Sequence, residues 1–522
     1  MVPRLRPPAR PFALQKLNRR SKTIFYLTSN PATSILFEQS SHSIIITMTT
    51  FELGRPPKRP IALRSIVIVA VLAAVVGGGY FLVPRFEWHK PQIKITPDTD
   101  TLGLAPVEVS ISEKGTGLKL AAVTLSMAGA ERPLFSERYD QPTMQTKFTV
   151  VSSKLTGVTE GPAVLRVTAL DRSLWSFFGG NESVVQKNVI IDITPPTVEL
   201  IADDAYVNFG GCGLIVYKPS ADTVTSGVKI GNYFFPGYKG QTKDPNAYIA
   251  FFAHPYNVAE DERAVLIATD KAGNSRQMRL AYTLKNVKYK KSTIAITDDF
   301  IQGKVAPLLN DVGARQGHPK DVFLKVNREL RKENEEKIKT ITQKSASSML
   351  WSGPFNQLSN SKVEANFADA RTYTYQNSVV DNAYHVGFDL SVTKRYPVEA
   401  ANSGTVAFVG DLGIYGNTVI IDHGLGLFTL YSHLSSTDVK SGDPIKKQQI
   451  IANTGETGLA AGDHLHFGVY LNGLAVLPIE WWDEKWLRDN VYPKLESPEP
   501  DLRAEVRTEP TAASKKVARR RR

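Results

Sequence analysis

The sequence predicts a mainly β, multidomain chain that is anchored to a membrane near its N-terminal end. Residues 65–83 form a run of 19 residues without a charge. Short alternations of apolar and polar residues, separated by turn residues, fill 91–290, and a third strand-rich region containing a group of histidines covers 350–490. We therefore expect a basic N-terminal segment, a transmembrane helix, two β-sandwiches, a helical linker and a C-terminal antiparallel β domain.

The N-terminal segment, residues 1–64, carries a net charge of +9 and is predicted to be cytoplasmic and disordered. Residues 1–47 show no periodicity, which indicates a disordered extension or an over-long gene model with Met48 as the alternative start. The apolar run at 65–83 is just long enough to cross a bilayer as a helix. Because Arg55, Lys58, Arg59 and Arg64 precede it, the N-terminus should stay in the cytoplasm and the remainder should be exported. A signal peptide cleaved near Gly77–Gly79 is the competing interpretation, but the length of the run favours an uncleaved anchor.

The two regions at 91–195 and 196–290 are each predicted to fold as a β-sandwich. Alternation is clear in Val107-Glu108-Val109-Ser110-Ile111, and strands at such regular spacing are typical of sandwiches. The stretch 264–274 echoes 163–173 and resembles the end of bacterial immunoglobulin-like modules. We interpret the pair as a spacer between the membrane and the C-terminal domain, with a binding module as the alternative.

Charge and cysteine content exclude several classes of protein. The net charge is +12, but residues 1–64 carry +9 and the last eight residues carry +6, so the body carries −3. This distribution argues against a nucleic-acid-binding fold. Cys212 is the single cysteine, which rules out an intramolecular disulfide and a cysteine-based metal site. The tail at 493–522 is rich in Pro, Glu and Arg and is predicted to be a disordered basic tail.

The linker at 298–345 is predicted to be helical. Its apolar residues recur at helical spacing among many Lys and Glu: Val322, Phe323, Val326, Leu330, Ile338 and Ile341. We expect an amphipathic helix or helical pair that packs on the C-terminal domain.

Five of the nine histidines lie between His385 and His466, and four of them belong to three short motifs. These motifs are His385-Val386-Gly387-Phe388-Asp389, Tyr431-Ser432-His433-Leu434 and His464-Leu465-His466-Phe467. Histidine and carboxylate ligands are typical of a catalytic zinc, which takes three protein groups and leaves one position open. Residues 467–471, Asn472-Gly473 and 474–476 predict a β-hairpin, so His464 and His466 should point to one face of a strand. A straight strand would separate residues 385 and 389 by about 13 Å. This distance is too long for two ligands of one metal ion. If both residues bind the same ion, the backbone must bend between them, and Gly387 permits the bend.

These motifs resemble those of the lysostaphin/LytM-type zinc metallopeptidases, whose pattern is H-x-x-x-D, then Y-x-H-L, then H-x-H. The surrounding segments agree in order over about 110–140 residues, including Tyr415-Gly416-Asn417 and Gly442-Asp443-Pro444; Gly468 replaces a residue that is often larger in the family. The resemblance implies that Zn²⁺ is held by His385, Asp389 and His466, and that His433 and His464 are the catalytic histidines. The C-terminal region at 350–490 would then be a zinc metallopeptidase domain of lysostaphin type.

The same resemblance implies the function. The chain would be a membrane-anchored zinc endopeptidase that hydrolyses peptide cross-links of peptidoglycan, in the bacterial inner membrane with its catalytic domain in the periplasm. No HExxH motif occurs, so His433 and His464 would act as base and oxyanion donor, whereas a structural role is expected for His423. Arg371 is either a contact for a substrate carboxylate or a structural hydrogen-bond donor. The alternatives are a non-enzymatic envelope protein that binds the wall or activates wall amidases, and a structural adhesin.

Overall fold

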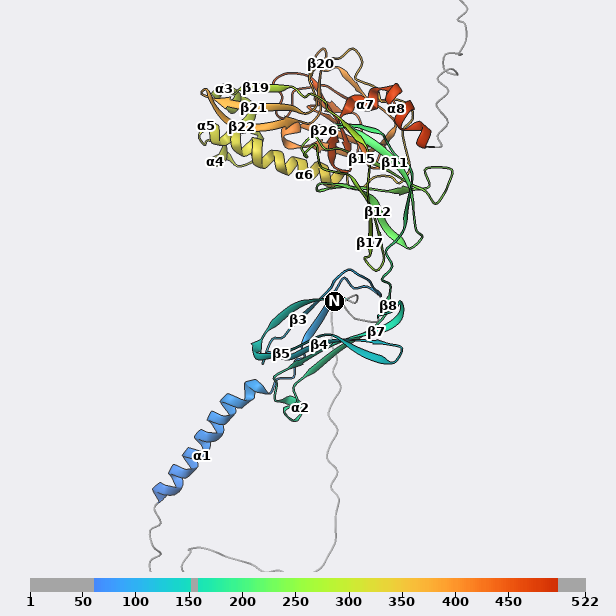
Figure 1. Ribbon diagram of the computed structural model, residues 1–522. Coiled ribbons are helices and arrows are strands. Elements are labelled where there is room, and N and C mark those ends of the chain that lie inside the picture. Colours follow the sequence, from blue (N-terminus) through green and yellow to red (C-terminus); the bar gives the residue numbers. More distant parts are fainter. Residues whose placement is uncertain (1–60, 152–157, 496–522) are drawn as a thin grey trace, which may run out of the picture. The chain divides into compact units, whose positions relative to one another are not determined.

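A computed structural model describes residues 61–151 and 158–495, and within these the chain is mainly β (Figure 1). Its contacts divide it into two compact units, Met1–Val76 and Gly77–Arg522. The predicted basic segment at 1–64 and the predicted tail at 493–522 lie outside the described residues, apart from the backbone of 61–64 and residues 493–495.

The apolar run forms helix α1, Ile61–Leu82. The stretch Ser65–Arg85 is long and apolar enough to span a membrane, with a mean hydropathy of 2.6, and none of it is buried against the protein. A short 3-10 turn, Val83–Arg85, with Pro84 in its first turn, ends the helix. The helix thus coincides with the predicted transmembrane segment at 65–83.

The strands between 91 and 195 form two sheets that share one apolar core. In β3, Val107, Val109 and Ile111 are buried and alternate with polar residues, which is the pattern of a strand with one solvated face. One sheet has the order β1-β3-β6 and the other β2-β8-β7-β4-β5. The bounds are β1 Gln92–Thr96, β2 Thr101–Leu102, β3 Val107–Ser112, β4 Leu118–Met127, β5 Ala130–Thr143, β6 Gln145–Val150, β7 Gly161–Asp171, helix α2 Trp175–Phe178 and β8 Glu182–Ile191.

A second pair of sheets follows, with strand orders β14-β15-β11-β9 and β13-β12-β16-β17, and β10 pairs with β18 in parallel. The bounds are β9 Val198–Ala202, β10 Tyr206–Asn208, β11 Cys212–Pro219, β12 Thr223–Ile230, β13 Tyr233–Pro236, β14 Tyr238–Lys239, β15 Tyr248–Ala253, β16 Val265–Asp270, β17 Ser275–Arg279 and β18 Thr283–Lys285. Cys212 is free and buried, as expected for a small apolar residue.

The second pair of sheets shares its core with the C-terminal domain, so it is more than a spacer. The Glu480 carboxylate accepts hydrogen bonds from the Cys212 backbone N–H and the Asn208 side chain, both at 2.7 Å. The ring of Trp481 packs against Phe251, with centroids 5.7 Å apart. One continuous cluster of buried side chains runs through both regions.

A strand precedes the predicted linker at 298–345, and the linker itself is helical and packs on the C-terminal domain. Strand β19, Lys291–Ala295, pairs in parallel with β21 and was not predicted from the sequence. The helical segments are α3 Asp298–Phe300, η3 Ile301–Val305, η4 Ala306–Leu308, α4 Val312–Arg315, α5 Pro319–Leu324, η5 Lys325–Leu330 and α6 Arg331–Ile341, of which η3 and η5 are π-helical. From Pro319 to Ile341 the helix is continuous, and Val322, Val326 and Ile338 are buried, as their spacing indicated.

The C-terminal domain is built on an eight-stranded sheet with the order β20-β23-β31-β27-β26-β25-β29, in which β32 also pairs with β31. Two smaller sheets flank it, β19-β21-β22 and β24-β30-β28. The bounds are β20 Lys362–Ala365, β21 Asp369–Tyr375, β22 Ser378–His385, β23 Phe388–Ser391, β24 Pro397–Glu399, β25 Gly404–Asp411, β26 Asn417–Asp422, β27 Leu427–Ser432, β28 Ser436–Thr437, β29 Pro444–Ile445, β30 Ile450–Asn453, β31 Leu465–Leu471, β32 Leu474–Val476, α7 Pro478–Trp482 and α8 Glu484–Asn490.

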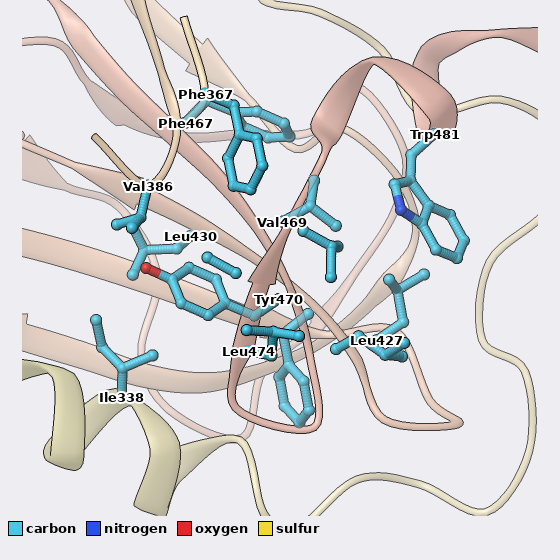
Figure 2. Close-up of a cluster of buried hydrophobic side chains, with 14 of the residues drawn as sticks. Ile338, Phe367, Val386, Leu427, Leu430, Phe467, Val469, Tyr470, Leu474 and Trp481 are labelled. Atoms are coloured by element: carbon cyan, nitrogen blue, oxygen red, sulfur yellow. The ribbon is translucent and has the colours of Figure 1, made fainter. Parts of the chain in front are cut away.

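Strands β31 and β32 form the hairpin that the sequence predicted. Leu471 pairs with Leu474, and Asn472 and Gly473 form the turn with φ of 48° and 87°, as a type I′ turn requires. Figure 2 shows Tyr470 and Leu474 of this hairpin in the buried cluster that also contains Ile338 of α6 and Trp481 of α7.

Candidate metal centre and active site

The sheet register brings Asp389 and His466 together. Asp389 of β23 lies directly opposite His466 of β31, so both side chains point to the same face of the sheet. His464 precedes His466 by two residues and shares that face. His385 comes from a different sheet, because it is the last residue of β22, and the chain crosses to β23 through Val386 and Gly387.

Gly387 is required at this crossing because of limited space. A Cβ at this position would lie 2.5 Å from the Phe467 carbonyl oxygen and 2.7 Å from His466 Nε2. Its φ is not in the left-handed region that favours glycine. The predicted bend between His385 and Asp389 is therefore present, but the glycine serves to let the crossing pass close to His466.

Three atoms of the predicted ligands converge on one point. His385 Nε2 and His466 Nδ1 each lie 2.9 Å from Asp389 Oδ1 and 3.0 Å from one another. His385 Nδ1 lies 2.9 Å from the Asn366 carbonyl oxygen, which only accepts, so the proton of the neutral ring belongs on Nδ1. The lone pair of Nε2 therefore faces a carboxylate oxygen.

This arrangement of donors fits a metal ion. Electron-rich atoms at such short mutual distances repel unless a proton or a cation lies between them. Two imidazole nitrogens and one carboxylate oxygen are also the ligand set of a catalytic zinc. The three residues are buried or half-buried, so water screens this repulsion only weakly.

His433 and His464 lie beside the three converging residues. The ring of His433 is centred 4.8 Å from that of His464 and 5.8 Å from that of His466. His433 Nδ1 donates to the Thr457 carbonyl oxygen and His464 Nδ1 to the Gly462 carbonyl oxygen, both at 2.8 Å. Each ring is thereby oriented so that its Nε2 remains available for chemistry, and His464 Nε2 lies 3.5 Å from Asp389 Oδ1.

The backbone at His433 is strained. This residue follows β27 directly and has a φ of 62°, in the left-handed region that non-glycine residues seldom occupy. Its N–H donates to the Tyr415 carbonyl oxygen at 2.9 Å, which fixes the backbone there. Such strain is concentrated at functional sites, where the surrounding structure maintains it.

Burial and mutual charge shift the pKa values of these groups in opposite directions. Burial alone would raise the pKa of Asp389, but His385, His464 and His466 beside it hold that pKa well below its usual value. Burial, together with the neighbouring histidines, lowers the pKa of His433 to about 3. At neutral pH, His433 is therefore an uncharged imidazole, and with its proton on Nδ1 the Nε2 atom carries the lone pair. Burial opposes charge on His464 too, but the carboxylate of Asp389 raises its pKa.

Arg371 pairs with acidic residues at the site. Its Nη2 lies 3.4 Å from Asp389 Oδ2, and its Nε lies 3.6 Å from Asp369 Oδ2. Asp369 is buried, and both of its carboxylate oxygens lie 2.8 Å from the Ser292 hydroxyl, which donates its one proton to them. Asp369 is also paired with His385 in the β21–β22 register. Of the two interpretations of Arg371, this geometry supports the structural one, because Arg371 fixes the oxygen of Asp389 that faces away from His385.

A cavity of about 420 Å³ opens onto the three converging residues and the two neighbouring histidines, His433 and His464. The linker forms part of the cavity wall. Phe300, Phe323 and Arg331 of the linker line it, together with Ile294 and Ala295 of β19 and the following Ile296. Tyr415, which the sequence placed in a matching segment but without a role, also lines the cavity with its ring 5.7 Å from that of His466. The sequence predicted that the linker packs on the C-terminal domain, but not that it lines the cavity, because the lining residues are distant along the chain from the histidines. His423 does not reach the cavity and instead bonds the Ser403 carbonyl oxygen and the Thr429 hydroxyl, as expected for a structural role.

Comparison with known proteins identifies the family to which the site-bearing region is similar. Residues 383–478 match the model of peptidase family M23. An uncharacterized metalloprotease of Haemophilus influenzae is 43% identical over 96 residues, which are 18% of this chain and 20% of that protein. The DD-carboxypeptidase/endopeptidase Mpg of Neisseria meningitidis is 38% identical over 95 residues, 18% of this chain and 22% of that protein. The peptidoglycan DD-endopeptidase ShyA of Vibrio cholerae is 32% identical over 115 residues, 22% of this chain and 26% of that protein.

The chain thus matches about a fifth to a quarter of the length of these curated relatives, and the matched part is the domain that carries the site. A crystal structure of a putative peptidase M23 from Pseudomonas aeruginosa is 18% identical and covers 53% of this chain and 94% of that chain, with a TM-score of 0.34. The catalytic domain of lysostaphin from Staphylococcus simulans is 28% identical and covers 24% and 92% of the two chains, with a TM-score of 0.21. The predictions of a mainly β chain and of a lysostaphin-type C-terminal domain are confirmed.

Proposed function

We propose that this chain, whose residues 383–478 form a peptidase family M23 domain, is a membrane-anchored zinc endopeptidase that hydrolyses peptide cross-links of peptidoglycan. One observation carries the proposal: His385 Nε2, Asp389 Oδ1 and His466 Nδ1 converge within 3.0 Å of one another beside two further oriented histidines. Relatives named as a DD-carboxypeptidase/endopeptidase and as a peptidoglycan DD-endopeptidase support the substrate class.

His385, Asp389 and His466 would hold the zinc, and Arg371 would keep the second oxygen of Asp389 in place. When bound, zinc supplies Lewis acidity, which activates a water molecule and polarises the scissile carbonyl. His433 and His464 divide the two remaining tasks, which are removal of the proton from the attacking water and donation to the carbonyl oxygen as negative charge develops there. Their Nδ1 atoms are already engaged by carbonyl oxygens, so both tasks belong to the Nε2 atoms.

Helix α1 supports a proposal for the location of the enzyme. The apolar stretch Ser65–Arg85 would cross the bacterial inner membrane once, with the basic N-terminal segment in the cytoplasm and everything after it in the periplasm. The catalytic domain would then face peptidoglycan directly. D-alanyl to diaminopimelate bonds are the cross-links expected in such an envelope.

Two paired variants of the full chain test the proposal. His385→Ala should lose zinc and activity, because it removes a ligand. His433→Ala should keep stoichiometric zinc, measured by mass spectrometry of the metal, but should release little soluble product from dye-labelled sacculi. Full zinc in His385→Ala would refute the ligand set. If the unaltered protein, loaded with stoichiometric zinc, released no more product than His433→Ala, the second candidate function, a non-enzymatic envelope protein that binds the wall or activates amidases, would be favoured.

A further inference from the structure

Five large aromatic side chains are exposed together on the first β-sandwich. Phe177 is 100% exposed, Trp88 70%, Phe178 69%, Trp175 44% and Phe86 41%. Phe86 pairs with Phe178 at a centroid distance of 6.4 Å, and Trp88 pairs with Trp175 at 5.8 Å. The two ring pairs thus join two chain segments, and Phe177 lies between Trp175 and Phe178 in the sequence; the five residues are here named the aromatic cluster. Contiguous exposed apolar patches mark interaction sites on proteins.

Hydrogen bonds fasten the two segments to one another. The Leu174 N–H donates to the Arg85 carbonyl oxygen at 2.7 Å, and the Ser173 hydroxyl donates to the Glu87 carbonyl oxygen at 2.7 Å. The Asn181 side chain donates to the same Glu87 oxygen at 2.8 Å. The loop that carries α2 is thus bound at both ends to the segment that follows the apolar helix, and the aromatic cluster has a defined structure.

The loop also has an unusual backbone. Ser176, Phe177 and Phe178 have φ values of 54°, 56° and 69°, so three consecutive non-glycine residues occupy the left-handed region. This conformation is unfavourable for residues with a Cβ and persists only where the surroundings enforce it. Its result is that both phenylalanines are directed to solvent. Unfavourable backbone and unfavourable exposure at the same residues indicate a surface built to bind something apolar.

The position of the aromatic cluster in the chain identifies its partner. Phe86 directly follows the apolar stretch Ser65–Arg85, and Trp88 is two residues further. Tryptophan rings prefer the boundary between headgroups and acyl chains, where one end of the ring is wet and the other is apolar. Arg85, exposed directly before Phe86, can keep its charged head in the polar headgroup region while its apolar stem lies deeper.

We propose that the aromatic cluster inserts into the headgroup–acyl boundary of the bilayer that α1 spans, so that the first β-sandwich is seated on the membrane surface. This inference rests on the proposed membrane anchoring. It adds a second contact with lipid, made by the folded domain through Trp175, Phe177 and Phe178, which are about 90 residues beyond the helix in sequence. The sandwich then has a fixed orientation on the membrane instead of swinging on a free linker.

Quenching of tryptophan fluorescence by brominated acyl chains tests the proposal, because bromine quenches only at close range. The full chain is reconstituted into phosphatidylethanolamine–phosphatidylglycerol vesicles with and without dibrominated lipid. The chain has six tryptophans, and the four outside the aromatic cluster are Trp351, Trp481, Trp482 and Trp486. We expect strong quenching of the unaltered protein, substantial quenching in Trp88→Phe, where Trp175 reports on the sandwich, loss of most of that remainder in Trp88→Phe/Trp175→Phe, and no loss in the matched control Trp486→Phe.

A second variant and a flotation assay make the outcomes distinguishable. Phe177 is fully exposed, so Phe177→Glu leaves the core intact, and its charge should lower the quenching of Trp88 and Trp175 severalfold. Flotation of each variant with vesicles on a density gradient tests the anchor alone. Protein that floats but shows equal quenching in Trp88→Phe and in the double variant overturns the seating of the sandwich. Unaltered protein that fails to float overturns the membrane anchoring itself.

Discussion

Gly387 offers a direct test of how the proposed metal centre is assembled. It lies between His385 and Asp389, and a Cβ there would approach the Phe467 carbonyl oxygen to 2.5 Å and His466 Nε2 to 2.7 Å. Ordinary van der Waals contact begins near 3.4 Å. In Gly387→Ala, the Phe467 carbonyl oxygen must therefore move away by about 0.9 Å and the His466 ring by about 0.7 Å, unless the new methyl group itself shifts by as much. The φ of Gly387 is compatible with alanine, so the effect is purely one of space.

The displacement falls on a proposed zinc ligand, which sets its expected size. Overpacking of this kind costs about 1–3 kcal/mol of folding stability. Disturbing the groups that orient a ligand lowers metal affinity about 10- to 100-fold. We therefore expect Gly387→Ala to bind zinc about 10- to 100-fold more weakly than the unaltered chain, while remaining folded, and to lose activity in parallel.

Competition with a chromophoric chelator measures the affinity, and circular dichroism verifies the fold. Gly303→Ala is the matched control, because no atom lies within 4 Å of its Cβ position and the residue is helical. The control should bind zinc normally. Unchanged affinity and activity in Gly387→Ala would refute the assignment of His466 as a ligand held against this crossing.

Two further predictions concern Arg371 and Glu480. Arg371→Met should weaken zinc binding about 10-fold or more, because Asp389 loses the guanidinium that lies 3.4 Å from its Oδ2 atom. Arg371→Lys should restore part of that loss. Equal zinc affinity in the unaltered chain and both variants, measured by the same chelator competition, would exclude a positioning role for Arg371. Burial raises the pKa of Glu480 from 4.5 to about 8. Between these pH values the folded state holds a proton that the unfolded state has released. The free energy of unfolding should therefore fall as the pH rises from about 4.5 to 8. The shift corresponds to at most about 5 kcal/mol. Glu480→Gln should flatten this slope even if it lowers the melting temperature, and an unchanged slope in melting temperatures between pH 5 and pH 8 would show that Glu480 does not titrate in this way.

Much of the site could be predicted from the sequence, because its signals are local. The spacing of His464 and His466, the Asn472-Gly473 turn and the alternation in 467–471 each depend on a few adjacent residues. These local patterns fix which side chains share a face. His385 and Asp389 are too far apart on a straight strand to bind one ion, so their spacing predicted a bend between them. The structure has that bend, because β22 ends at His385 and β23 begins at Phe388.

The long-range packing left no such signal. Glu480 contacts Cys212 across 268 positions, and β19 joins β21 in parallel although about 75 residues separate them. Nothing in the alternation of either segment identifies its partner, so the shared core of the second β-sandwich and the catalytic domain was missed. Arg371 remained ambiguous for the same reason, since its role depends on Asp369 and Asp389, which only the folded chain places beside it.

The most direct test of the proposed function is the identity of the products released from peptidoglycan. The full chain in detergent is incubated with zinc and cross-linked sacculi, with and without a chelator, and the soluble and residual muropeptides are identified by mass spectrometry. We predict chelator-sensitive conversion of cross-linked dimers to monomers, restored by added zinc and absent in His433→Ala. Intact dimers in the presence of a stoichiometrically zinc-loaded protein would contradict the proposal that this chain is a peptidoglycan endopeptidase.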